Sequence, residues 1–339
     1  PGEQAELSAD TLLGFARQAG AMGCRVFALT GGEPFIHPEF ERIVDGLLGI
    51  NDAHVAILTN GMSVAKHRDR VGAWPTDRFH LQISVDGLQK NHDALRGQGA
   101  FRRLTENLAI LRDQQRPYTL SMCVTRQNLA DMPGIVDLAA ANGAANVHYM
   151  WYFIRGRAEE DRYAPPEEIA PALKQAAQRA QQAGVGIDNL DALRGQVFAP
   201  EGTRHDGTNA GWESAAIGPD AHLYPTPATI GLDELAVPLD GSLPDAWASF
   251  ATLERIRETT GANLADPLRF LLGGGDFDHS FMHGRAFTGA DPYDPLNRQM
   301  ALDLIADQAR CQPDDGPPAL RLKMRSEEHT SELQSLLII

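Results

Sequence analysis

Cysteine is scarce in this chain, whose 339 residues contain only Cys24, Cys123 and Cys311. An odd number of widely spaced cysteines argues against a disulfide scaffold, fits a reducing cytoplasmic compartment and leaves no multi-cysteine metal cage in this sequence. Long hydrophobic runs are also absent, since no stretch approaches the roughly 18 apolar residues of a membrane helix. No charged segment precedes an apolar one at the start. We therefore expect neither a membrane span nor an uncleaved secretory signal.

Positive charge is in short supply. The chain has 30 Lys and Arg against 45 Asp and Glu, which gives a net charge of -15. Proteins that bind duplex nucleic acid usually present a basic face, so we expect no nucleic-acid partner. Hydrophobic residues reach 43%, enough for a packed core, and the length predicts about two domains at roughly 150 residues each.

Short apolar strands alternate with amphipathic helices through the first half. Strands are predicted over 25–30, 54–61, 79–87, 118–125 and 147–153, and helices over 38–48, 99–114 and 132–142. This alternation is typical of parallel βα units, and it predicts an α/β barrel or open half-barrel. A doubly wound sheet is the alternative, but no G-x-G-x-x-G follows the first strand.

The pattern loosens from about residue 164. A helix over 167–183 leads into glycine- and proline-rich chain with a strand pair near 214–224 and helices near 248–259 and 297–309. We place a domain boundary near residue 185, with a partial barrel over 1–185 and a smaller α+β domain over 186–324.

Polar or glycine-rich signals follow nearly every predicted strand: Gly31-Gly32-Glu33-Pro34, Asn60-Gly61, Ser84-Val85-Asp86-Gly87 and Arg126. Each signal alone suits an ordinary turn. Together they meet at one end of a parallel sheet, where two glycines let a ligand approach the backbone. Pro34 favours an extended Glu33, which aims that carboxylate across the barrel mouth. A carboxylate there suits an ammonium group, and Asn60 and Ser84 suit ribose or carboxylate oxygens.

The segment from about residue 8 to residue 160 resembles the radical S-adenosylmethionine (SAM) enzymes. The run from Gly31 to Phe40 (GGEPFIHPEF) carries the resemblance most specifically, with LTNG ending at Gly61 and SVDG ending at Gly87 in support. The resemblance implies a partial (β/α)6 TIM-like barrel with its first strand missing. It implies S-adenosylmethionine bound by Gly31, Gly32, Glu33, Pro34, Asn60, Ser84, Asp86 and Arg126, with Trp151 on the substrate side.

The chemistry implied by this resemblance needs a second cofactor. In the family, a reduced [4Fe–4S] cluster cleaves SAM to a 5′-deoxyadenosyl radical, which abstracts hydrogen from the substrate, and flavodoxin or ferredoxin supplies the electron. The family's Cys-x-x-x-Cys-x-x-Cys loop does not occur in this sequence. We expect its cysteines upstream of Pro1, and we interpret Cys24 and Cys123 as small core residues. The chain by itself is then expected to be inactive.

The second half offers three weaker signals. The segment from Trp212 to Pro227 resembles the hairpin of the SPASM extension without its cluster-binding cysteines, which suggests a peptide or a peptide-derived cofactor as substrate; an unrelated hairpin is the alternative. A glycine-rich loop then brings together Asp276, Asp278, His279 and His283. These could bind a divalent metal or act as acid and base, but a helix-capping Asp in a lid that contacts substrate is favoured. Residues 325–335 resemble a translated sequencing adapter, so we predict that 325–339 is a non-native tail.

Three functions remain open. The leading prediction is a radical SAM enzyme acting on a small molecule or peptide. The second is a non-catalytic SAM- or peptide-binding protein that has lost its cluster. The third is a metal-dependent barrel hydrolase that uses the carboxylates and imidazoles of residues 276–283.

Overall fold

The computed structural model describes residues 6–153, 160–200, 203, 207–259 and 265–310, together with the backbone of 335–338. Cys311 and residues 325–334 of the predicted tail lie outside the described residues. No helix in the described ranges combines the length and the apolar character needed to cross a membrane.

Six parallel strands form a curved sheet in the order β6-β5-β4-β3-β2-β1. They are β1 (Val26–Leu29), β2 (His54–Thr59), β3 (Phe79–Ser84), β4 (Tyr118–Val124), β5 (Asn146–Trp151) and β6 (Gly186–Ile187). The order is consecutive, without the reversal that marks a doubly wound sheet. The predicted α/β partial barrel is therefore confirmed.

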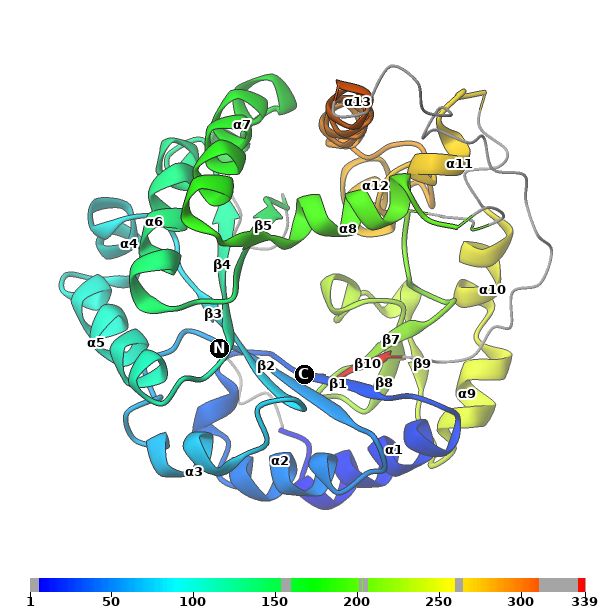
Figure 1. Ribbon diagram of the computed structural model, residues 1–339. Coiled ribbons are helices and arrows are strands. Elements are labelled where there is room, and N and C mark those ends of the chain that lie inside the picture. The colour runs from blue at the N-terminus through cyan, green and yellow to red at the C-terminus, as the bar shows by residue number, and fades with distance from the viewer. Residues whose placement is uncertain are drawn as a thin grey trace.

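Helices form an outer layer around this sheet (Figure 1). They are α1 (Ala9–Ala21), α2 (Phe40–Leu48), α3 (Arg68–Ala73), α4 (Gln89–Arg96), α5 (Ala100–Asp113), α6 (Met132–Asn142) and α7 (Pro166–Ala183), with short 3-10 turns at Pro34–Ile36 (η1), Leu129–Asp131 and Glu160–Arg162. The Ser8 hydroxyl caps α1 by accepting a hydrogen bond from the Thr11 backbone N–H at 3.2 Å, as its position in the sequence predicts. Local sequence therefore sets where α1 begins.

The two faces of the sheet differ in chemistry. Alternate residues of β2 and β3 are fully buried, including Ile57 and Ile83. The residues between them are more exposed, and in β3 they are polar: His80, Gln82 and Ser84. Gln82 donates to the Ser121 hydroxyl of β4 at 2.9 Å. One face of these strands therefore packs in the core, while the other carries polar side chains along β3.

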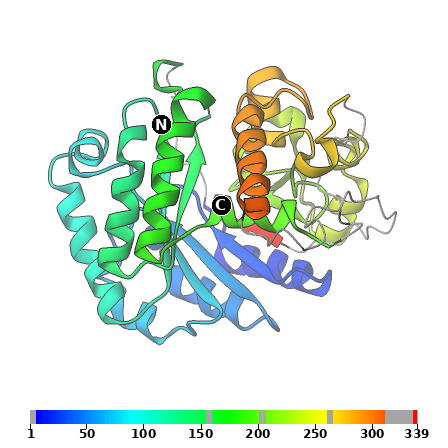
Figure 2. The same ribbon diagram turned by 45° about the horizontal axis from the view of Figure 1, so that its top comes forward.

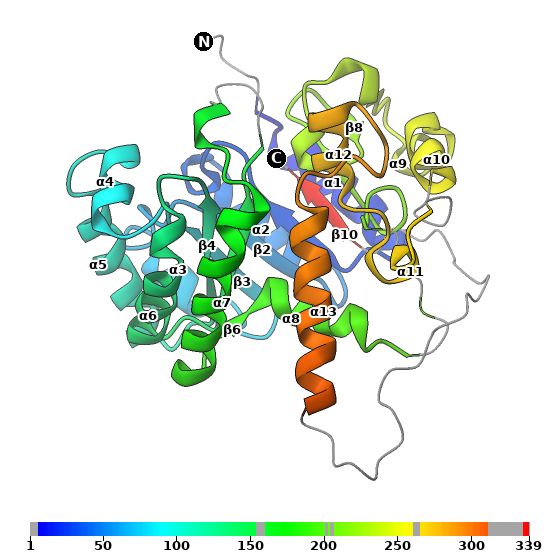
Figure 3. The ribbon, with the colours of Figure 1, turned by 90° about the horizontal axis from the view of Figure 1, so that it is seen from above.

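The second half packs against the open side of the half-barrel (Figure 2). Its antiparallel strands β7 (Ser214–Ile217), β8 (His222–Tyr224) and β9 (Val237–Pro238) confirm the predicted hairpin. Its helices are α8 (Asp188–Val197), α9 (Leu243–Ser249), α10 (Ala251–Glu258), α11 (Arg269–Leu272), α12 (Phe277–Gly284) and α13 (Asp294–Arg310), and 3-10 turns lie at Pro227–Thr229 and Asp233–Leu235. The long α13 packs on α8 (Figure 3), and one continuous apolar core runs from α1 to α13. The domain boundary near residue 185 stays a prediction.

A short strand joins the two halves. β10 (Ser335–Ile338) lies between β1 and β7 and pairs parallel with both. This arrangement links ten strands into one sheet, in the order β6-β5-β4-β3-β2-β1-β10-β7-β8-β9. The non-native origin of residues 325–339 stays a prediction, although β10 was not expected from their sequence.

Candidate functional site

The Glu33 carboxylate ties together the carboxyl ends of two strands. One oxygen accepts hydrogen bonds from the Thr59 hydroxyl at 2.7 Å and from the Phe35 backbone N–H at 3.2 Å. The other oxygen accepts the Asn60 backbone N–H at 2.8 Å. Glu33 has an extended backbone, with φ −151° and ψ 108°, as its position before Pro34 predicts. The carboxylate is therefore held at the mouth of the half-barrel.

The two glycines before Glu33 leave their backbone accessible. Gly31 has φ 126°, a conformation that favours glycine, and both glycines are exposed. A Cβ atom added to Gly32 would meet no atom within 4 Å. A ligand can therefore approach this turn without displacing protein atoms.

Asn60 and Ser84 lie at the carboxyl ends of the next two strands. The Asn60 side-chain oxygen accepts the Met62 backbone N–H at 2.8 Å, which shapes the turn after β2. Ser84 is the last residue of β3 and is partly exposed. Since β1, β2 and β3 are adjacent and parallel, the predicted Glu33, Asn60 and Ser84 lie along one edge of the sheet.

Asp86 and Arg126 have partners within the protein. The buried Asp86 carboxylate accepts from the Arg96 guanidinium at 2.5 Å, and the Asp86 backbone N–H donates to His92 at 3.1 Å. Arg126 makes two hydrogen bonds of 3.1 Å with Glu168 on α7, and these raise the pKa of the Arg126 guanidinium. Both side chains therefore shape the protein around the site, and direct cofactor contact by either stays a prediction.

The side chains of residues 276–283 do not converge. Asp276 caps α12 by accepting the His279 backbone N–H at 3.0 Å, as predicted, and burial raises the pKa of its carboxyl. Asp278 accepts a hydrogen bond from the Thr226 hydroxyl, and His283 is exposed. Within the described ranges, no group of three His, Cys, Asp or Glu side chains could hold a metal ion. The described residues therefore give the metal-dependent hydrolase no support.

His279 places α12 over the end of β5. Its ring stacks on Phe153, with centroids 4.0 Å apart, and meets Tyr293 edge-on at 4.8 Å. Burial lowers the pKa of His279 to about 3, so its imidazole is neutral near pH 7. Tyr293 also stacks on Trp151, with centroids 5.9 Å apart. The predicted loop thus covers a strand end of the barrel.

A cavity of about 780 Å³, which we call the β5–α8 cavity, lies between the half-barrel and the second half. Two of the predicted substrate residues, Trp151 and Asp276, are in its wall. Asp278, His279 and His283 are not among its lining residues. The volume is in the range of small-molecule and cofactor sites.

Sequence reasoning missed the polar groups at the floor of this cavity. His148 lies 2.8 Å from the Asp188 carboxylate, and both line the β5–α8 cavity. The Asn189 side chain accepts the Tyr149 backbone N–H and donates to the Tyr149 carbonyl, both at 2.8 Å, which fastens α8 to β5. A polar His148 within an apolar strand was the available signal. Asp188 and Asn189 gave no such signal in the sequence, because they follow the predicted domain boundary.

The described cysteines do not fit a [4Fe–4S] cluster. Cys24 is buried between α1 and β1, and Cys123 lies on β4. Burial raises the pKa of the Cys123 thiol to about 12, whereas an iron ligand must be a thiolate. The interpretation of Cys24 as a core residue is confirmed, and Cys123 is only partly buried. No reaction step through a cluster follows from the described residues.

The half-barrel with its glycine turn, held carboxylate and polar strand ends defines an α/β protein whose polar groups gather at the carboxyl edge of a parallel sheet, the usual place of ligand sites in this class. Residues 1–139 match the sequence profile of the Radical SAM superfamily. Residues 1–139 therefore form a domain of this superfamily.

Curated relatives cover different shares of the chain. It is 30% identical to the AdoMet-dependent heme synthase of Methanosarcina barkeri over 49% of this chain and 46% of that protein. It is 26% identical to the antilisterial bacteriocin subtilosin biosynthesis protein AlbA of Bacillus subtilis, over 66% of this chain and 47% of that protein. The chain thus spans about half the length of these two relatives. A PqqA peptide cyclase of Ruegeria pomeroyi is 26% identical over 76% of this chain and 70% of the relative.

Solved structures share the fold. The protein anSMEcpe with bound AdoMet and the Cp18Cys peptide superposes with a TM-score of 0.71, at 13% identity over 88% of this chain and 89% of that one. SuiB of Streptococcus suis superposes with a TM-score of 0.67, at 15% identity over 80% of this chain and 67% of that one. The half-barrel and the second half therefore have counterparts of the same overall fold.

Proposed function

We propose that this chain forms the AdoMet- and substrate-binding body of a cytoplasmic radical SAM enzyme that abstracts hydrogen from a peptide or a peptide-derived cofactor. One observation carries the proposal: the exposed Gly31–Gly32 backbone stands beside a Glu33 carboxylate anchored across two strand ends. A flavodoxin or ferredoxin would be the electron donor of the complete system.

Glu33 is suited to the ammonium group of AdoMet. A carboxylate offers about four lone-pair sites, and three of them accept protein hydrogen bonds here. One site is left for an external donor, and the three internal bonds prevent the side chain from turning away. The accessible Gly31 and Gly32 backbone and the Ser84 hydroxyl supply further polar groups for the methionine and ribose parts.

The β5–α8 cavity is the proposed place of the substrate. Its wall combines Trp151 with the polar groups of His148, Asp188 and Asn297. Aromatic surface with a few polar groups is the usual composition of a ligand site. The proposed peptide class is supported by relatives named as a PqqA peptide cyclase and a bacteriocin biosynthesis protein, and by the structure of SuiB bound to its precursor peptide.

A valine at Gly32 tests the AdoMet site. Its Cβ atom would enter open space, so Gly32→Val should keep the fold and block ligand approach. Gly195→Val in α8 is the matched control, because a Cβ atom there also meets no atom within 4 Å. We expect calorimetry to show AdoMet affinity reduced more than tenfold in Gly32→Val alone, with both variants folded. Equal affinity in the two variants would place AdoMet elsewhere.

Cleavage of AdoMet separates the enzyme from a binding protein. Cys24 lies between α1 and β1 and Cys123 lies on β4, so this chain should bind AdoMet without cleaving it. We expect no 5′-deoxyadenosine after anaerobic treatment of the chain with iron, sulfide and a reductant. Cleavage of AdoMet after addition of an upstream segment that carries three cysteines would identify the protein as an enzyme. Formation of 5′-deoxyadenosine by the present chain would refute our interpretation of its cysteines.

A further inference from the structure

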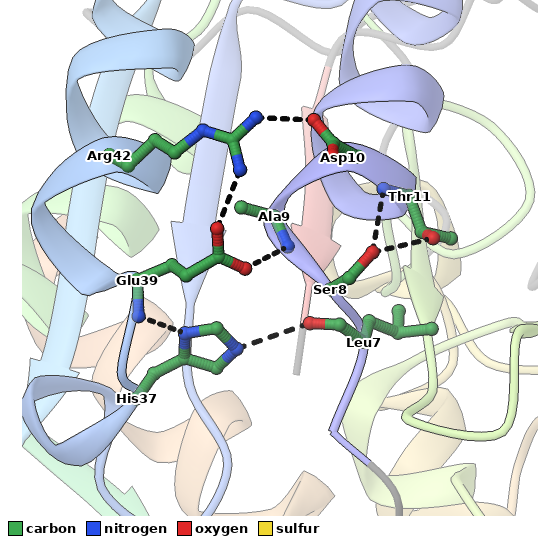
Figure 4. A network of polar contacts seen from close by, with 8 residues as sticks. All are labelled: Leu7, Ser8, Ala9, Asp10, Thr11, His37, Glu39 and Arg42. Carbon is green, nitrogen blue, oxygen red and sulfur yellow. Dashed lines mark hydrogen bonds and ion pairs between the residues drawn. The ribbon is translucent and has the colours of Figure 1, made fainter.

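His37 uses both of its ring nitrogens to hold separate parts of the chain (Figure 4). The Glu39 backbone N–H donates to His37 Nδ1 at 3.1 Å, so Nδ1 carries no hydrogen. His37 Nε2 lies 3.1 Å from the Leu7 carbonyl oxygen, which can only accept. Only the neutral imidazole with its hydrogen on Nε2 satisfies both bonds.

Two neighbours of His37 extend this connection to the first turn of α1. Glu39 accepts the Ala9 backbone N–H at 3.1 Å, and that bond lowers the pKa of the Glu39 carboxyl. Arg42 donates to Glu39 at 2.5 Å and also to Asp10 (Figure 4). Residues 7–10 are thereby fastened to the segment from His37 to Arg42.

The same segment is continuous with the proposed AdoMet site. The single turn η1 separates Glu33 from His37, and the His37 backbone N–H donates to the Pro34 carbonyl at 3.1 Å. Glu33 holds the other end of this turn through the Phe35 backbone N–H. Phe35 is buried, with its ring centroid 4.4 Å from that of Phe40. A shift of His37 would therefore be passed to the Glu33 carboxylate.

We propose that His37 is a positioning residue that, as the Nε2–H tautomer, fixes the start of α1 against the Gly31–Pro34 turn and so sets the place of Glu33. The proposal rests on the AdoMet site described above for its functional consequence. Its structural part, the bond from Nε2 to Leu7, stands on the geometry of this chain.

Two substitutions test the roles of the two ring nitrogens of His37 separately. The side-chain oxygen of asparagine lies about as far from Cβ as Nδ1, so His37→Asn keeps the acceptor for Glu39 and loses the donor to Leu7. The longer His37→Gln places an amide N–H near the position of Nε2 and keeps the donor. His54→Asn and His54→Gln are matched controls, because His54 is exposed at the amino end of β2.

Hydrogen exchange and NMR test the structural part without any ligand. We expect the Ala9 amide to exchange at least tenfold faster in His37→Asn than in wild type, with most protection kept in His37→Gln and in both His54 variants. Long-range ¹H–¹⁵N spectra should show the Nε2–H tautomer of His37. Unchanged protection in His37→Asn, or an Nδ1–H tautomer, would overturn the proposal.

Calorimetry with AdoMet tests the consequence. We expect a dissociation constant about five- to tenfold higher in His37→Asn and within twofold of wild type in His37→Gln. Equal AdoMet affinity in all variants would refute the proposal that His37 sets the place of Glu33, and it would leave the proposed AdoMet site unaffected. Absence of binding by the wild-type chain would instead refute the proposed function, while Ala9 exchange would still decide whether His37 holds the start of α1.

Discussion

The Thr59 hydroxyl donates a 2.7 Å hydrogen bond to the Glu33 carboxylate, across 26 residues of sequence. Two neighbouring parallel strands, β1 and β2, are thereby joined at their carboxyl ends by side chains as well as by their backbone ladder. We propose a functional role for this bond, because it orients the carboxylate that we assign to AdoMet binding.

Replacing Glu33 by glutamine tests this assignment. Glu33→Gln keeps the size of the side chain and removes its charge, so we expect AdoMet affinity to fall roughly thirty- to several-hundred-fold, equivalent to about 2–4 kcal/mol. Calorimetry measures the loss. Thr59→Val, which removes only the orienting hydroxyl, should weaken binding less. An unchanged affinity in Glu33→Gln would show that the ammonium group binds elsewhere.

The pair formed by Asp86 and Arg96 allows a double-mutant cycle. The Asp86 carboxylate is buried and Arg96 is partly exposed, so we expect a coupling free energy of about 1 kcal/mol between Asp86→Ala and Arg96→Ala. Urea unfolding of the four proteins provides it. If AdoMet affinity falls in Asp86→Ala and not in Arg96→Ala, Asp86 also contacts the cofactor. If the two substitutions have additive effects on the free energy of unfolding, the ion pair does not stabilise the protein.

His279 should make stability depend on pH. Its folded pKa of about 3 lies below the usual value near 6.5, so its stabilising contribution is present above pH 6.5 and is lost as pH falls toward 3. His279→Phe keeps the aromatic stack and cannot titrate. Between pH 6.5 and 4.5, wild type should lose about 2 kcal/mol of unfolding free energy relative to this variant.

The comparison with His279→Phe cancels other groups, such as Asp276 and Asp291, whose pKa values burial raises in both proteins. His54→Phe, at an exposed position, is the matched control for the loss of a histidine. A constant difference between wild type and His279→Phe would mean that the imidazole is solvated in the folded protein.

Removal of β10 tests its place in the sheet. Chains ending at Met324 or at Gln334 both lack β10, and both leave the facing backbone groups of β1 and β7 without their strand partner. We expect a lower urea midpoint and more association in size-exclusion chromatography for both, because open strand edges pair with other chains. Midpoints equal to that of the full chain would show that β10 is dispensable, as a non-native tail predicts.

Much of the half-barrel follows from short-range pattern. The predicted helix over 132–142 coincides with α6, and the predicted strands differ from β1 to β5 by at most three residues at either end. Apolar periodicity and capping residues act within a few positions, so they can be recognised in the sequence. The two-residue β6 and the helix α8 were missed because one is too short for a periodic signal and the other begins without a polar cap before it.

By itself, the sequence determined the alternation of strands and helices, the gathering of glycine and polar residues at strand ends, and the family of its first 139 residues. Tertiary structure decided which of these polar groups find a partner within the protein. Arg126 pairs with Glu168, 42 positions later, and Asp86 with Arg96, while Glu33 stays at the open mouth. The reason is physical: helical and strand periodicity depends on neighbours along the chain, whereas a charged side chain takes the nearest partner that packing brings to it.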